Sequence, residues 1–375
     1  AWEADYRTMV LSLGDYMRKA GFERAVLGLS GGVDSTAVVD SMARSREESV
    51  VACSVGFRER SHDELDTARA TASRLGAVHH TEVLEPDPVQ AFEVLPWLFD
   101  EPHADPSDLP TYLVSRMARE HVTVALSGDG GDEVFAGYRR YAHDLAENRL
   151  RSALGSVGRG LAARAGALYP KLDWAPRPLR ARTFLENLGR DPAAAYYHSV
   201  TQLSRADALA LLAPDLARAV ADFDPFERFA EHYRRPVGAD SVYRAQYADL
   251  HTYLPDQILA KADRASMGAS LEVRVPLLDH RFVERFAPVA TEHKIRGARG
   301  KHCFREALRE RVPGDVLDAS KRGFDTPLRG WFRGPLKQLA RESIEALPED
   351  WLRKEVLRAR LAEHVEGRRD HGRLL

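Results

Sequence analysis

The sequence contains little cysteine, no long apolar run and almost no net charge, and each absence excludes a class of protein. Only Cys53 and Cys303 occur among 375 residues, which argues against a disulfide framework and a cysteine-based zinc site. No apolar run approaches the roughly 18 residues of a membrane-spanning helix. The net charge of −2 gives no electrostatic reason to expect nucleic-acid binding. We therefore expect a cytoplasmic protein with no membrane or nucleic-acid partner.

The order of apolar patterns predicts an α/β fold. Helical and strand-like segments alternate up to about residue 145, with strands predicted at 25–29, 50–57, 78–84 and 122–126 and an initial helix over 6–17. Such alternation favours a parallel sheet with helices on both faces. Beyond residue 145 the strand signal fades into Ala-, Leu-, Arg- and Glu-rich segments broken by prolines. We therefore divide the chain into an α/β domain, 1–145, and a mainly helical region, 146–375.

The segment SGGVDS, residues 30–35, connects the first predicted strand to a helix. A helix N-terminus offers unpaired backbone N–H groups that suit a phosphate, and Gly31 and Gly32 allow close approach. Asp34 would repel a phosphate, so a Mg²⁺ ion better explains its presence. The alternative is an ordinary glycine-containing turn with a capping residue. The loop is not of the Walker A type, because no Gly-Lys-Ser/Thr closes it.

A second loop, SGDGGDE at residues 127–133, follows the fourth predicted strand in the same way. Asp129, Asp132 and Glu133 gather there at the start of a helix, which by itself is consistent with simple complementarity to the helix dipole. A divalent metal shared by Asp34 and Asp132 would explain the carboxylates of both loops at once. Because the carboxyl ends of parallel strands share one edge of a sheet, the two loops are predicted to meet.

Four segments carry a resemblance to known enzymes. SGGVDS resembles the pyrophosphate-binding loop of the ATP pyrophosphatases. The chain from about residue 25 to 375 is similar to the synthetase domain of B-type asparagine synthetases in SGGVDS, FDEPHADPSDLPTYLVSRMAREHVTVALSGDGGDEVFAGYRRY, YLPDQILAKADRASMGASLEVRVPLLDHRFVE and SKRGFDTPLRGWF. The resemblance implies a Rossmann-like ATP pyrophosphatase fold. It also implies an ATP-dependent ligase that adenylates a carboxylate, aspartate or a related acid, and then transfers ammonia or another amine.

The same resemblance implies roles for particular residues. Those expected at ATP or its pyrophosphate are Ser30, Gly31, Gly32, Asp34, Ser35, Val55, Ser127 and Gly128. Asp34 and Asp132 would hold Mg²⁺. Lys321 matches a lysine that contacts the phosphates and stabilises the transition state. Asp129 stands where asparagine synthetases carry glutamate near the acyl group, and where β-lactam synthetases carry tyrosine.

The third segment gathers charge around the small residues ASMGAS, which suggests a buried polar network. Its members are Lys261, Asp263, Arg264, Glu272 and Arg274. Such a network is either structural, holding the helical region against the sheet, or in contact with the substrate. The residue pattern leaves both interpretations open.

Two departures from the resemblance leave alternatives open. Glutamine-dependent relatives begin with a glutaminase domain that has an N-terminal cysteine, whereas residue 1 here is alanine. We therefore expect either that the sequence is a fragment or that it uses free ammonia, a separate glutaminase partner or another amine. Residues 1–36 also resemble NAD synthetase, which keeps amidation of deamido-NAD as an alternative. A nucleotide-binding protein without turnover is a second alternative. The oligomeric state, a homodimer included, stays open.

Overall fold

A computed structural model describes most of the chain, namely residues 26–28, 32–45, 49–57, 65–170, 181–312, 314–318, 326–372 and 374. The structural statements below concern these residues. The predicted helix over 6–17 lies outside them, as do Ser30, Gly31 and Lys321. None of the described helices combines the length and the apolar character needed to cross a membrane.

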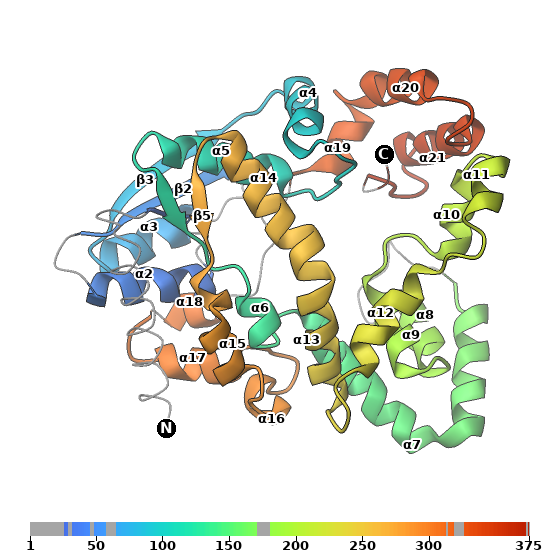
Figure 1. The fold of residues 1–375 in the computed structure, drawn as a ribbon, viewed down its shortest axis with the longest axis horizontal. Coiled ribbons are helices and arrows are strands. Elements are labelled where there is room, and N and C mark those ends of the chain that lie inside the picture. The colour runs from blue at the N-terminus through green and yellow to red at the C-terminus, as the bar shows by residue number, and fades with distance from the viewer. Residues whose placement is uncertain are drawn as a thin grey trace.

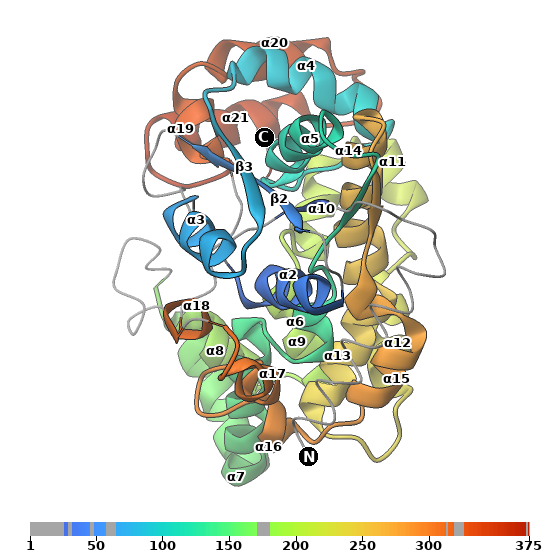
Figure 2. The ribbon, with the colours of Figure 1, turned by 90° about the vertical axis from the view of Figure 1, so that its left-hand side faces the viewer.

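A small parallel sheet lies at the centre of the α/β part (Figures 1 and 2). Its strand order is β3-β2-β1-β4-β5. The strands are β1 (Val26–Gly28), β2 (Val51–Phe57), β3 (Val78–Leu84), β4 (Val124–Leu126) and β5 (Glu272–Arg274). Three of them, β1, β4 and β5, have only three residues each. Because β1 pairs with both β2 and β4, the segments that follow β1 and β4 leave the sheet side by side.

Each face of the sheet has its own apolar core, because successive side chains of a strand point to opposite faces. Ala52 packs in one core with residues of α2 (Val33–Ser45) and α3 (Leu65–Arg74). Its neighbour Cys53 packs in the other with residues of α4 (Pro88–Phe99) and α5 (Asp108–Arg119). Cys53 is fully buried, and burial raises its thiol pKa to about 12. Cys53 is therefore part of the core beneath α4 and α5.

The remainder of the described chain is mainly helical, as predicted. Its longest helix, α7 (Arg139–Leu168), is kinked at Gly155, which has φ 62°. The other elements are α6 (Gly131–Val134), α8 (Arg182–Leu188), α9 (Pro192–Val200), α10 (Arg205–Leu211), α11 (Pro214–Ala219), α12 (Pro225–Arg234), α13 (Ser241–His251), the π-helical turn η3 (Leu254–Leu259), α14 (Ala260–Gly268), the short 3₁₀ turn η4 (Pro276–Leu278), α15 (His280–Phe286), α16 (Thr291–Lys294), α17 (His302–Leu308), α18 (Gly314–Asp318), α19 (Leu328–Arg333), α20 (Lys337–Ala346) and α21 (Lys354–Val365).

The predicted strands are found, with β3 at the predicted bounds and β4 shortened. The predicted fading of the strand signal beyond residue 145 misses β5, which lies far along the chain and pairs with β4. With only three residues, Glu-Val-Arg, β5 is too short and too polar to give an apolar strand pattern. The helical region therefore contributes directly to the sheet next to the second loop.

Candidate active site

The site begins where the two predicted loops meet at the carboxyl edge of the sheet. The backbone N–H of Ser127 donates a 2.8 Å hydrogen bond to the carbonyl of Arg274, which extends the pairing of β4 with β5. The next residue, Gly128, packs against the start of α2. A Cβ added at Gly128 would lie 2.8 Å from the backbone nitrogen of Ser35 and 2.9 Å from Cβ of Asp34. The second loop therefore approaches the first this closely only with glycine at this position.

Asp34 and Asp132 converge on one lysine that the sequence did not single out, Lys301. Asp34 lies in the first turn of α2 and Asp132 in the first turn of α6. The Lys301 ammonium contacts Oδ2 of Asp34 and lies 2.7 Å from Oδ1 of Asp132. The three side chains are largely buried, with exposed fractions of 18%, 13% and 5% for Asp34, Asp132 and Lys301. The predicted pair of carboxylates is thus brought together, with a cation between them.

Lys301 is held by its backbone as well as by its ion pairs. It precedes α17 with φ 58° and ψ 28°, in the left-handed region, and its N–H donates a 3.0 Å hydrogen bond to the carbonyl of Phe135. Gly137 makes room for it, because a Cβ there would overlap the Asp132 carboxylate and Cε of Lys301. A positive φ is uncommon for a residue with a side chain. The ammonium is therefore set in a preformed position beside both carboxylates.

The electrostatics of the three groups favour a charged lysine. Burial alone would lower the Lys301 pKa, but the carboxylates of Asp132 and Asp34 outweigh it and hold the pKa above its ordinary value. The Arg305 guanidinium is a further cation that acts on both carboxylates. Two carboxylates at one point fit a hard cation such as Mg²⁺, which binds oxygen ligands. Among the described residues no cluster of three or more histidine, cysteine, aspartate or glutamate side chains suits a metal.

The rest of the second loop is tied together locally. The Ser127 hydroxyl donates to Oδ2 of Asp129 at 2.7 Å, and the Asp129 N–H donates back to the Ser127 hydroxyl at 3.3 Å. The Glu133 side chain is only 1% exposed, and its Oε1 accepts a 2.8 Å hydrogen bond from the Tyr138 hydroxyl. Glu133 therefore anchors the loop in the helical region, while Ser127 and Asp129 stay at the edge of the sheet.

Two further predicted nucleotide residues are buried. The Ser35 hydroxyl donates a 3.1 Å hydrogen bond to the Gly32 carbonyl, within the first turn of α2. Val55 lies inside β2, two residues before its end at Phe57. It is 6% exposed and belongs to the core shared with α5.

The five charged residues of the third segment do not form the single buried network that the sequence predicted. Asp263 and Arg264 are exposed on the outer face of α14, while Glu272 and Arg274 pair with each other at 2.6 Å on a partly exposed strand. Of the five, Lys261 alone bonds to the loop before α5, through Ser107. Helical periodicity separates it from Asp263, whereas Arg264, three positions on, lies on a neighbouring part of the helix and remains exposed.

Lys261 joins a polar cluster that sequence reasoning missed. Its ammonium donates to the Ser107 hydroxyl at 2.7 Å and lies 3.9 Å from Oδ2 of Asp105. The same Asp105 oxygen accepts from Nε2 of Gln257 at 3.0 Å, in the π-helical turn η3. Asp108 in turn lies 2.9 Å from Nδ1 of His103, and this bond raises the His103 pKa despite burial. In the sequence, this cluster is indicated by the acidic segment DEPHADPSD, which contains two prolines. A buried loop with so many charged residues needs polar partners.

The signal for Lys301 was weaker. In RGKHCFREAL a lysine stands immediately before an apolar helical pattern, where an N-cap serine, threonine or aspartate is usual. Nothing in the spacing connects it to Asp34.

Comparisons with known proteins show the family to which the chain belongs. The asparagine synthase family matches residues 18–375. Asparagine synthetase [glutamine-hydrolyzing] 1 of Bacillus subtilis strain 168 is 30% identical over 351 residues, covering 92% of this chain and 53% of the relative. A putative asparagine synthetase [glutamine-hydrolyzing] of Mycobacterium tuberculosis H37Rv is 33% identical over 357 residues, covering 92% and 52%. The chain belongs to the asparagine synthase family, and it spans about half the length of these relatives.

A shorter similarity is also present. The glutamine-dependent NAD(+) synthetase of Rhodobacter capsulatus is 48% identical over 84 residues, which cover 22% of this chain and 15% of that protein. The resemblance to NAD synthetase expected from the sequence is therefore found, over a limited part of the chain.

Proposed function

We propose that this chain is an ATP-dependent amide-forming ligase of the asparagine synthetase type. It would adenylate a carboxylate, aspartate or a related acid, with release of pyrophosphate, and then transfer ammonia or another amine with release of AMP. The observation that carries the proposal is the convergence of Asp34, Asp132 and Lys301 at the junction of two glycine-containing loops. We further infer that the sheet and its flanking helices are an ATP pyrophosphatase-type, Rossmann-like domain, with the division near residue 145 as predicted.

In the proposed first step, a carboxylate oxygen of the acid bonds to the α-phosphorus of ATP as the bond from that phosphorus to the β-phosphate's bridging oxygen breaks. Negative charge builds on the departing pyrophosphate. Ser30, Gly31, Gly32 and Ser35 are proposed to hold it at the N-terminus of α2, where backbone N–H groups favour anions. Lys301 already stands as a protonated cation beside this helix end, and Lys321 is the second cation proposed.

Asp34 and Asp132 are the residues proposed to hold Mg²⁺. Bound there, the ion would neutralise charge on the phosphates during the displacement. Ser127 and Gly128 would then face the nucleotide from the second loop, and Val55 would lie on the adenine side of the site. Asp129, bonded to Ser127 at the same edge, is proposed to act near the acyl group.

In the proposed second step, the amine nitrogen attacks the carbonyl carbon of the acyl-adenylate. The bond from that carbon to the AMP oxygen breaks, AMP leaves with the electron pair, and the nitrogen loses a proton. Ammonia supplied in solution, a separate glutaminase or a different amine all satisfy this chemistry. The proposal therefore leaves the nitrogen source open among free ammonia, a separate glutaminase partner and another amine.

The second candidate function is NAD synthetase-like amidation of deamido-NAD, which the 48% identity over 84 residues favours. Both candidates begin with adenylation, so ATP–pyrophosphate exchange tests the shared chemistry. We would measure exchange with aspartate, other amino acids and deamido-NAD in turn. Exchange with aspartate supports the asparagine synthetase type and exchange with deamido-NAD supports the second candidate. ATP binding without exchange for any acid would identify a nucleotide-binding protein without turnover.

A further inference from the structure

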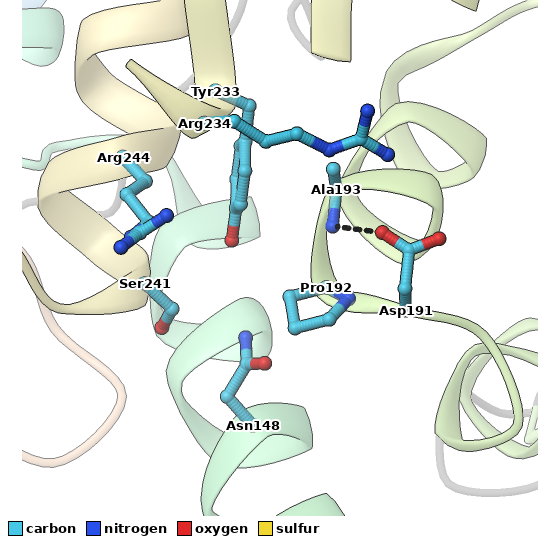
Figure 3. Close-up of a pocket in the computed structure, with 8 residues that line it drawn as sticks. All are labelled: Asn148, Asp191, Pro192, Ala193, Tyr233, Arg234, Ser241 and Arg244. Carbon is cyan, nitrogen blue, oxygen red and sulfur yellow. Dashed lines mark hydrogen bonds between the residues drawn. The ribbon is translucent and has the colours of Figure 1, made fainter. Parts of the chain in front are cut away.

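A cavity of about 290 Å³ lies in the helical region, between α7, α9, α12 and α13. Figure 3 shows its lining: Asn148, Asp191, Pro192, Ala193, Tyr233, Arg234, Ser241 and Arg244. None of these residues belongs to the loops of the candidate active site. The volume is at the small end for ligand pockets, which suits a molecule much smaller than a nucleotide.

Tyr233 is the buried polar group that points into this cavity. Its side chain extends from α12 so that the hydroxyl lies toward Ser241 and Asn148 (Figure 3). Tyr233 is only 2% exposed, and its hydroxyl has no hydrogen-bond partner among the described residues. A buried hydroxyl without a partner is costly, and native structures contain few of them. The cavity thus presents a donor that a ligand oxygen would satisfy.

Two guanidinium groups line the same cavity without an ion-pair partner in the described structure. Arg244 donates from Nε to the carbonyl of Ala239 at 3.0 Å, and this is the only hydrogen bond found for its side chain within those residues. Arg234 is exposed and lies with its guanidinium 5.8 Å from the ring centre of Phe226. In Figure 3 the Arg234 guanidinium extends toward Ala193, whereas that of Arg244 lies on the side of the Tyr233 hydroxyl. An unpaired guanidinium with a buried hydroxyl donor matches an oxyanion, above all a carboxylate.

The surrounding acids restrict the charge of that oxyanion. Asp191 lines the cavity and uses Oδ1 to cap α9 at the N–H of Ala193, 3.1 Å away. Asp144, one turn before Asn148 on α7, is buried, and burial raises its pKa to about 7. A dianion such as phosphate would face the Asp191 carboxylate and, above that pH, the Asp144 carboxylate as well. A zwitterion instead places its negative group by the arginines and its positive group by Asp191.

We propose that this cavity is a binding site for a free α-amino acid, separate from the ligase site. The ligand carboxylate bonds to the guanidinium of Arg244 and accepts from the Tyr233 hydroxyl. The Asp191 carboxylate at the rim provides the counter-charge for the ligand ammonium, and the volume limits the ligand to a single amino acid.

The test is saturation-transfer NMR of the full 375-residue chain with a mixture of the proteinogenic amino acids, followed by titration of each one that responds. At least one should bind saturably, with Kd below about 1 mM. Tyr233→Phe should weaken that Kd by about tenfold while leaving thermal stability equal or higher, because it removes a hydroxyl without a partner. Arg244→Ala should weaken it at least as much. Arg228→Ala, on an exposed part of α12 outside the cavity, is the matched control and should bind normally.

Several outcomes would overturn the proposal. These are no binding by any amino acid, or a Kd that Tyr233→Phe and Arg244→Ala leave unchanged. Equal competition by succinate or inorganic phosphate would show that the ammonium is not recognised. Loss of binding in Asp132→Asn, with binding retained in the two cavity variants, would assign the signal to the proposed ligase site.

Discussion

Lys301 and Asp34 lie 267 positions apart in the sequence, yet their side chains are in contact, and the same lysine lies 2.7 Å from Oδ1 of Asp132. Three elements, α2, α6 and the turn before α17, therefore meet at one buried point. A lysine between two carboxylates keeps them together although they would otherwise repel each other. The arrangement gives the proposed site both the oxygen ligands for a cation and a fixed positive charge.

Asp34→Asn and Asp132→Asn should each abolish adenylation while preserving the fold. Two carboxylates that share one ion cannot lose a charge without losing its stabilisation of the transition state. ATP–pyrophosphate exchange measures the effect, and far-UV circular dichroism checks the fold. Asp66→Asn is a matched control, because Asp66 also lies in the first turn of a helix near the sheet but is exposed. Near-normal exchange in either test variant would remove the metal assignment.

Lys301→Met should destabilise the protein by about 3 kcal/mol in the absence of divalent ions, because it leaves two buried carboxylates facing each other without their cation. Millimolar Mg²⁺ should then raise the melting temperature of this variant more than that of the unaltered protein. Differential scanning calorimetry with and without Mg²⁺ provides this measurement independently of activity.

Lys294→Met is the matched control for that experiment. Lys294 is 1% exposed, but its ammonium bonds to the carbonyl of Ala287 and the side-chain oxygen of Gln246, not to a carboxylate. The Lys294→Met substitution should not make the melting temperature more dependent on Mg²⁺. If Lys301→Met and Lys294→Met respond to Mg²⁺ alike, Asp34 and Asp132 do not form a cation site.

The sheet and half of the site were predictable from sequence because their signals are local. Apolar runs bounded by glycine mark β1 and β4, and Asp34 and Asp132 each follow such a run by a few residues. Parallel pairing of adjacent strands then brings both loops to one edge of the sheet. The strand topology alone therefore predicts that the two loops meet.

Lys301 and β5 could not be predicted in this way because their roles depend on tertiary contacts. The position of Lys301 depends on a positive φ, the space left by Gly137 and the packing of α17. The strand conformation of β5 depends on its pairing with β4 and not on the strand propensity of its own three residues. The grouping of Lys261 with Asp263 and Arg264 failed for a related reason, since the bond of Lys261 to Ser107 is a tertiary contact, while Asp263 and Arg264 stay exposed.

Asp144→Asn should flatten the pH dependence of stability between about pH 4 and 7. Burial raises the Asp144 pKa to about 7, so the folded protein retains a proton that the unfolded chain releases near the ordinary pKa of 3.8. The folded state binds more protons across this range, and stability therefore falls as pH rises. At pH 8 the variant should be more stable by at least about 1 kcal/mol, since one pKa unit corresponds to roughly 1.4 kcal/mol.

Chemical unfolding at several pH values checks this, with the exposed Asp222→Asn as control. Glu147, whose pKa burial also raises to about 7, remains in both proteins, so some pH dependence should persist. Equal slopes in Asp144→Asn and the unaltered protein would contradict the assignment to Asp144.

Lys321→Ala should reduce the rate of adenylation by about a hundredfold or more, as is typical when one preorganised donor to a transition state is lost. Lys321 stands in DASKRGFDTPLRGWF, and in the same segment Thr326 donates from its N–H and its hydroxyl to the carbonyl of Pro106, each at 2.8 Å. That contact ties Thr326 to the DEPHADPSD loop, which leads into α5. ATP affinity should change much less, because ground-state binding is proposed to rest on the loops at Ser30 and Ser127.

Lys321→Arg should not restore the full rate, since a broad guanidinium does not replace a compact ammonium. Single-turnover kinetics separate the chemical step from binding, with Lys337→Ala on α20 as a control lysine outside the proposed site. A lysine that stabilises the departing pyrophosphate affects the rate of the step, whereas a general binding group affects Kd for ATP and the rate equally. Equal losses of adenylation rate and of ATP affinity would make Lys321 a binding residue. If neither the rate nor the affinity fell, the role implied by the family would not apply at this position.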